Sequence, residues 1–370
     1  MKSGQSTQTN LLPVRSAVRR LYAEHYLLIT LLSFAGSVTL TRLFLNLTGF
    51  PQLGGGVLHI AHVLWGGLLL FVAALFPLIL ANRWALDVSA FLSGIGVGLF
   101  IDEVGKFITQ QNDYLFPAAA PIIYALFLIT LLVYTLVRRK RETDPRRNLY
   151  LVLEQLEDVI DRDLSDLEKS EIIRRLKEIK KQSQEPALIG LAGSLIRYLQ
   201  SKKIALVAEK LVWWQKIERD WLNFENRTFT RNTHRFFMVT GIFIWGSWAI
   251  AHSLLSWYLS LNKIPLSGLV SELINNHLPL SSSWIGLIEM RIGMEILAGA
   301  VLLAACFLFI IRKEHLAVKV SVVTFLFSIC VIYLLLFYYE QFSSIFYALI
   351  QSSLLMIILR YRNRFLTNQS

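Results

Sequence analysis

Ionisable side chains interrupt two apolar stretches of this chain. His59 and His62 are three positions apart, so both imidazoles can project from one face of a helix. Asp102, Glu103 and Lys106 follow near the end of the next apolar stretch. A neutral imidazole binds a metal or carries a proton, and a carboxylate completes either set. The spacing therefore favours a polar site that binds an ion, relays a proton or holds a polar head group.

A metal is one interpretation of this site. The ligands would be His59, His62 and Glu103, and the ion a divalent metal such as zinc, with Arg42 or Arg291 as a nearby counter-charge. The other interpretation is a hydrogen-bonded structural pair of histidines that holds no metal. The spacing leaves both open, because it fixes neither a third nor a fourth ligand.

Further ionisable residues occur in the later apolar stretches. A charge at the bilayer centre costs roughly 2.5–3.5 kcal/mol on insertion scales, so such groups normally face a partner or a polar cavity. On the topology described below, all of them fall toward the leaflet away from the cytoplasm. We therefore expect one polar cluster, made of Arg42, His59, His62, Asp102, Glu103, Lys106, His252, Glu289, Arg291, Glu295 and Glu340. A plain network of salt bridges between helices would also account for Glu289, Arg291 and Glu295.

Two local arrangements are expected around the carboxylates. Gly94 and Gly98 have the GxxxG spacing of closely packed helices, which we expect to bring the second and third spans together. Asp102 and Lys106 are four residues apart and are expected to pair along their own helix, leaving Glu103 turned elsewhere.

The apolar stretches that carry these residues are long enough to cross a bilayer. About twenty residues as a helix cover the roughly 30 Å of hydrocarbon. The expected spans are residues 26–48, 57–81, 88–109, 115–137, 236–261, 284–311, 317–338 and 342–359. The chain is 54% hydrophobic and 17% charged, with a mean hydropathy of +0.50, which is more apolar than a soluble domain. We predict an all-α polytopic membrane protein with about eight transmembrane helices.

A charged insert separates the first four spans from the last four. Residues 165–168 fit a capping box, and an apolar stripe at helical spacing follows them. Further helices are expected at 149–160, 186–199 and 204–224, which predicts a small helical domain. The expected regions are a tail (1–25), four membrane spans (26–137), the insert (138–235), four more membrane spans (236–361) and a second tail (362–370).

The loop charges predict the orientation. The formal net charge is +11, and the basic residues gather at Arg83, 138–141, 312–313 and 360–364, whereas Lys263 lies on the opposite side. By the positive-inside rule, we expect a protein of the cell inner membrane whose termini and insert lie on the cytoplasmic side. The basic entry of the insert, Arg138 to Arg147, is expected to contact membrane lipids, and no nucleic-acid partner is expected. The sequence does not indicate an oligomeric state.

Several motifs resemble an uncharacterised family of prokaryotic multi-pass membrane proteins. They are HIAHVLWGG at 59–67, GLFIDEVGKFIT at 98–109 and NDY at 112–114, with MRIGME at 290–295 and YEQF at 339–342 in the later half. The resemblance implies a bacterial inner-membrane setting and no particular activity.

Three functions fit these observations. The first is binding or transport of an ion, proton, or polar or lipid head group at the outer-leaflet cluster. The second is a membrane-embedded, metal-dependent hydrolase that acts on a lipid-linked substrate, although the sequence contains no serine or cysteine nucleophile motif. The third is a structural or sensory protein that signals through the cytoplasmic insert.

Overall fold

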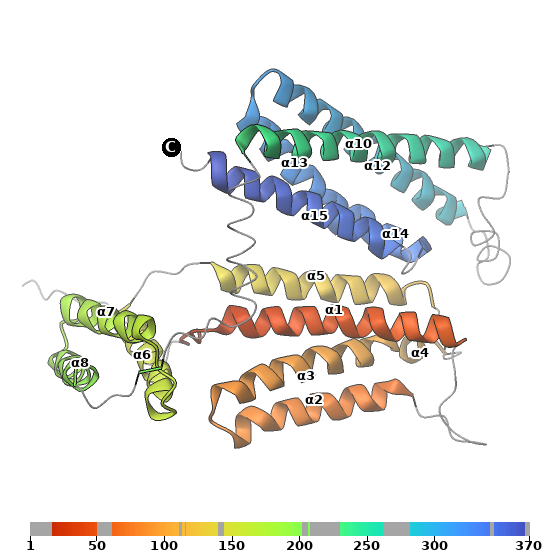
Figure 1. The fold of residues 1–370 in the computed structure, drawn as a ribbon. Helices are drawn as coiled ribbons and strands as arrows, with labels where there is room; N and C mark the ends of the chain where they lie inside the picture. The colour runs from red at the N-terminus through yellow and green to blue at the C-terminus, as the bar shows by residue number, and fades with distance from the viewer. Residues whose placement is uncertain are drawn as a thin grey trace, which may run out of the picture. The chain divides into compact units, whose positions relative to one another are not determined.

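The computed structural model of the chain describes residues 17–49, 61–110, 113–114, 116–139, 144–201, 206–207, 230–261, 282–340 and 344–366. Every regular element in these ranges is a helix, and their only strand-like feature is an isolated bridge between Ser165 and Val207. The predicted all-α fold is confirmed (Figure 1).

The described residues contain 8 helical segments that are long and apolar enough to cross a membrane. They are α1 (Ala23–Thr48), α2 (His62–Ile79), α3 (Arg83–Asp102), α5 (Ala119–Arg138), α10 (Arg231–Leu261), α12 (Ser282–Ile310), the run of α13 (Glu314–Phe327), η1 (Ser328–Ile332) and α14 (Tyr333–Glu340), and α15 (Ile345–Tyr361) continued by η3 (Arg362–Leu366). Between 11% and 50% of each apolar window is buried, so large apolar faces point outward. A surface of this kind suits lipid and not water, as expected for a multi-pass membrane protein.

The described residues form two compact units, residues 1–99 with 130–216 and residues 100–129 with 217–370. In the first unit, Gly94 and Gly98 of α3 face α1. A Cβ atom on Gly94 would lie 1.9 Å from Ser33 Oγ, and Gly96 faces α2, where a Cβ would lie 2.9 Å from the Gly66 carbonyl oxygen. The prediction that Gly94 and Gly98 join the second and third spans is therefore wrong. They share one helix face, which α1 covers, and Gly96 lies roughly 200° further round the helix.

The insert in this unit contains three described helices, α6 (Pro145–Ile160), α7 (Asp166–Gln182) and α8 (Pro186–Leu199). The predicted capping box forms, because Ser165 Oγ accepts from the Glu168 backbone N–H while the Glu168 carboxylate accepts from the Ser165 N–H. The three helices share one apolar core, made of Val152, Leu164, Ile172, Leu176, Ile179, Ala192 and Leu199. The helix expected at 204–224 lies outside the described residues apart from 206–207.

The insert is attached to the membrane helices of its own unit through charged groups. Arg83, at the start of α3, lies 2.6 Å from the Asp158 Oδ1 atom of α6 and 4.1 Å from the centre of the Tyr22 ring. The Glu154 carboxylate accepts from the Leu21 backbone N–H at 3.0 Å. Burial raises the pKa of Asp158 although Arg83 acts in the opposite direction, so this contact is partly dehydrated. We call Tyr22, Arg83, Glu154 and Asp158 the insert anchor.

The second unit is a bundle of the later spans. The backbones of α10 and α12 approach closely, because a Cβ on Gly299 would lie 2.8 Å from the Gly246 carbonyl oxygen. The α13 and α15 helices pack beside them around one buried core (Figure 1). The α5 helix contributes Tyr124, whose ring stacks on Phe337 at 4.3 Å and whose hydroxyl donates to the Ile329 carbonyl at 2.9 Å.

The predicted topology can be tested by thiol labelling of intact cells. In a variant with Cys306 and Cys330 replaced by alanine, a single cysteine at exposed Gln184, between α7 and α8, should resist an impermeant reagent. A single cysteine at Asn275, between the fifth and sixth spans, should react. Equal labelling at both positions would contradict the topology, and permeabilised cells provide the control for reactivity.

The contact between α1 and α3 can be tested with a matched pair of substitutions. Gly94→Ala should reduce the stability of the purified protein by about 1–3 kcal/mol, because the new methyl group overlaps Ser33 and the Thr30 carbonyl. Gly67→Ala should have little effect, since a Cβ there meets nothing within 4 Å. Thermal unfolding measures both, and an equal change in the two variants would contradict the proposed packing.

Candidate functional site

The predicted site residues of the early spans are distributed over both units. Arg42 is half-buried in α1, and His62 is the first residue of α2. His59 lies outside the described residues, so the zinc set of His59, His62 and Glu103 stays a prediction. In the portion of the chain that the structure describes, no three His, Cys, Asp or Glu side chains are grouped as a metal site requires.

The two carboxylates of the early spans lie at a break in the helix. Asp102 and Glu103 are 0% and 1% exposed, between the end of α3 and the start of α4 (Val104–Ile108). Tyr114 donates its hydroxyl to Asp102 Oδ2 at 2.5 Å, and Lys106 Nζ lies 3.2 Å from Glu103 Oε1. The expectation that Glu103 turns away from Lys106 is therefore wrong. The backbone leaves the α-helical conformation at Glu103 (φ −91°, ψ 10°), so the regular helical spacing does not hold between Lys106 and the turn before the break.

The segment after this break folds back over a glycine. The hydroxyl of Thr109 accepts from the Asp113 backbone N–H at 2.8 Å and donates to the Gly105 carbonyl at 2.8 Å. A Cβ on Gly105 would lie 2.6 Å from the Asp113 carbonyl oxygen, so a side chain there would disrupt the turn. This turn positions Tyr114 beside Asp102. Sequence reasoning gave Tyr114 no role, although it lies in the NDY motif.

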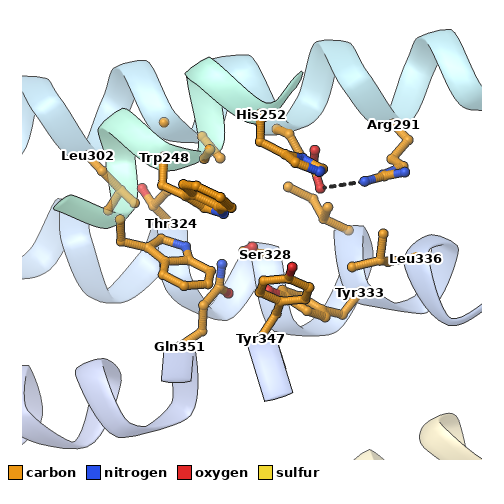
Figure 2. A pocket seen from close by; sticks show the side chains of 16 residues that line it. Trp248, His252, Arg291, Leu302, Thr324, Ser328, Tyr333, Leu336, Tyr347 and Gln351 are labelled. Atoms are coloured by element: carbon orange, nitrogen blue, oxygen red, sulfur yellow. Dashed lines mark hydrogen bonds and ion pairs between the residues drawn. The ribbon is translucent and has the colours of Figure 1, made fainter. Parts of the chain in front are cut away.

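The second unit contains a cavity that brings together three predicted residues. His252 of α10 and Arg291 and Glu295 of α12 line it (Figure 2). Arg291 lies 3.4 Å from Glu295 Oε1, and Ser253 donates to Glu295 Oε2 at 2.7 Å. The Arg291 and Glu295 side chains are 11% and 15% exposed, so this is a shielded ion pair. By contrast, Glu289 is exposed and does not line the cavity, and the side chain of Glu340 lies outside the described portion of the chain.

Sequence reasoning missed the residue that closes the cavity from α15. Gln351 is 5% exposed and points into the cavity, and its Oε1 atom has no hydrogen-bond partner in the described structure (Figure 2). A buried acceptor without a partner is costly, and such groups are few in native proteins. The signal for it in the sequence was an amide, followed by Ser352 and Ser353, within a long apolar stretch.

Another wall of the cavity contains the π-helical segment η1. Its first and last residues, Ser328 and Ile332, both line the cavity. Single π-helical turns inside α-helices occur frequently at functional sites, because they reorient side chains and free backbone groups. The sequence predicted an uninterrupted span here, since the apolar run shows no proline or glycine at this point.

The size of the cavity limits what it can hold. It has about 50 Å³ of space for the centres of water-sized molecules. One water needs roughly 10–15 Å³ by this measure, so there is room for a few waters or one small polar group. The cavity fits a small ligand, or one end of a larger ligand, and not a whole lipid.

No family model, curated protein or solved structure matches this chain. The resemblance drawn from the motifs therefore rests on those residues, and the proposals below rest on the geometry of the sites.

The role of Gln351 can be tested through stability. Gln351→Met replaces the amide with an apolar chain of similar length and removes the unsatisfied acceptor. We expect the protein without ligand to gain stability, by up to about 1–3 kcal/mol. Ser353→Ala, on the exposed side of α15, is the control and should change little. A lower melting temperature for Gln351→Met would show that the amide has a partner in the folded protein and would contradict this account.

Proposed function

We propose that the chain is an inner-membrane protein that binds, and transports, a small ion, a proton or a polar head group through a polar site within its membrane region. One observation carries the proposal: Arg291, Glu295 and His252 meet the unsatisfied amide of Gln351 around a cavity in the second unit. Ionisable groups among apolar spans are costly, and they are typical of substrate and ion pathways.

The hydrogen bonds within the site support binding rather than a purely structural network. Both oxygens of Glu295 are held, one by Arg291 and the other by Ser253, so the carboxylate has a fixed position. His252 stacks on Trp248 at 5.9 Å between ring centres, which fixes the imidazole plane. Gln351 Oε1 has no hydrogen-bond partner in the described structure and faces the cavity, so a ligand there would satisfy it.

The carboxylates at the α3–α4 break are the second element of the proposal. On the predicted topology they lie toward the same leaflet as the cavity. Asp102 and Glu103 are buried and hydrogen-bonded, so they can exchange a proton or bind a polar group with little change in backbone structure. The zinc-dependent hydrolase remains an alternative that depends on His59.

A sensory function is the other candidate that a specific observation favours. The insert anchor connects the helical insert to the ends of α1 and α3 through a partly dehydrated ion pair. Such a connection lets the position of the membrane helices affect the insert. This role is compatible with ligand binding and would make the ligand a signal.

The proposal can be tested by ligand-dependent thermal stability of the full-length protein in lipid nanodiscs. The probes are sodium, potassium, methylammonium, acetate and phosphate at constant ionic strength, each between pH 5.5 and 8. At least one probe should raise the Tm by about 2–4 °C at roughly ten times its Kd, because it binds the folded state.

The matched variants are Glu295→Gln and Glu289→Gln, which remove carboxylates from the same helix, one inside the cavity and one exposed. Glu295→Gln should lose the response, and Glu289→Gln should keep it. An identical response in both variants would contradict a site at Glu295.

A further inference from the structure

The lining of the cavity indicates which chemical class of ligand it takes. We infer that it holds a substituted ammonium group, such as the head of choline or of another alkylated amine, and this inference rests on the function proposed above. Two tryptophans and two tyrosines line the cavity, namely Trp245, Trp248, Tyr333 and Tyr347. Figure 2 shows Trp248, Tyr333 and Tyr347 around the same space as Gln351.

Aromatic walls favour a cation over an anion. The face of an aromatic ring carries partial negative charge, which attracts an ammonium group, most strongly at tryptophan. The same faces repel an anion. Among the described residues that line the cavity, Arg291 is the one arginine, and it pairs with Glu295, so an anion would have to compete with that carboxylate for the guanidinium.

The polar groups of the cavity also suit a cation. Glu295 offsets the positive charge of the paired Arg291, and the free Oε1 atom of Gln351 is an acceptor that needs a donor or a positive charge. Calcium takes 6–8 oxygen ligands and magnesium a near-ideal octahedron, usually with carboxylates among them. Besides Gln351 and the hydroxyls of Thr324, Ser328, Tyr333 and Tyr347, the described lining offers one carboxylate, which already pairs with Arg291, so a divalent cation would meet little negative charge. A weakly hydrated organic cation needs fewer oxygens, because the rings replace its hydration shell.

The size and position of the cavity agree with this class. Its volume corresponds to roughly three to five water-sized groups, close to a nitrogen with its methyl substituents. Trp248 is 51% exposed on the outside of the bundle, so the wall of the cavity reaches the apolar surface of the protein. An amine can therefore arrive free in solution or as the head group of a lipid.

The test compares choline with its uncharged carbon isostere, 3,3-dimethylbutan-1-ol, on the full-length protein in nanodiscs of phosphatidylglycerol. The two molecules have the same shape and differ in charge. Choline should raise the Tm in a saturable way, and the isostere should not. Glu295→Gln should abolish the response to choline, while Glu289→Gln should retain it.

Substitution of one wall residue tests whether its aromatic ring, and not only its apolar bulk, contributes to binding. Trp248→Leu should weaken the apparent affinity for choline by roughly two- to thirty-fold, which is the range expected for one cation–π contact. Trp257→Leu, an exposed tryptophan of the same helix that does not line the cavity, should leave it unchanged. If Trp248→Leu does not fold, Trp248→Phe serves instead, and it should show a smaller loss because phenylalanine binds cations less strongly.

Each outcome decides a separate question. An equal response to choline and the isostere would overturn the inference, because shape and not charge would then determine binding. A response to acetate, phosphate or a metal cation without one to choline would overturn it and leave the proposed function standing. If no probe changes the Tm and Glu295→Gln behaves as the unmodified protein, both fail. Added phosphatidylcholine should raise the choline concentration needed if a lipid supplies the head group, and unchanged binding assigns the site to a free amine.

Discussion

An ionised side chain within an apolar helix cannot be solvated by lipid, so its partners must come from the protein. The two polar sites meet this requirement in different ways. Glu103 pairs with Lys106, three positions later in the chain, at 3.2 Å. Glu295 takes Arg291 from its own helix and Ser253 from α10, so its hydrogen bonds also join two helices. The contact at Gly246 and Gly299 brings the same two helices together, and the two contacts set the geometry of one wall of the cavity.

Both polar sites lie where a span departs from regular α-helix. The break at Glu103 ends α3 and starts α4, and it turns Lys106 toward the carboxylate. The η1 segment widens the seventh span by one residue per turn and places Ser328 and Ile332 on the cavity wall. A carbonyl of η1, that of Ile329, accepts a hydrogen bond from Tyr124 of α5, which supports an irregular segment among apolar neighbours. These departures cost backbone hydrogen bonding, and the protein retains them beside the groups that can do chemistry.

The sequence predicted the spans because a run of about twenty apolar residues is long enough to cross a bilayer as a helix. It predicted the grouping of His252, Arg291 and Glu295 because an ionisable side chain within a span requires a polar or charged partner. It could not predict which helix a glycine face meets. The period of Gly94 and Gly98 gives a face, but only the tertiary arrangement shows that α1 covers it. Gln351 and the aromatic walls were missed for a related reason. Aromatic residues in an apolar span usually contact lipid or core, and the spacing does not reveal that four of them, from three helices, share a cavity with an amide.

The insert anchor holds the start of α3, as it holds the residues just before α1, against the insert. The helix begins at Arg83, which binds Asp158 of the insert and lies over the ring of Tyr22, and it ends at Asp102, beside the break at Glu103. Twenty residues of helix extend about 30 Å, which is the thickness of the hydrocarbon layer. The start of α3 therefore carries a cation that the insert pairs, and its end carries a buried carboxylate that accepts a hydrogen bond from Tyr114. At each end of the helix the charged group has its partner in the protein, as a span surrounded by lipid requires.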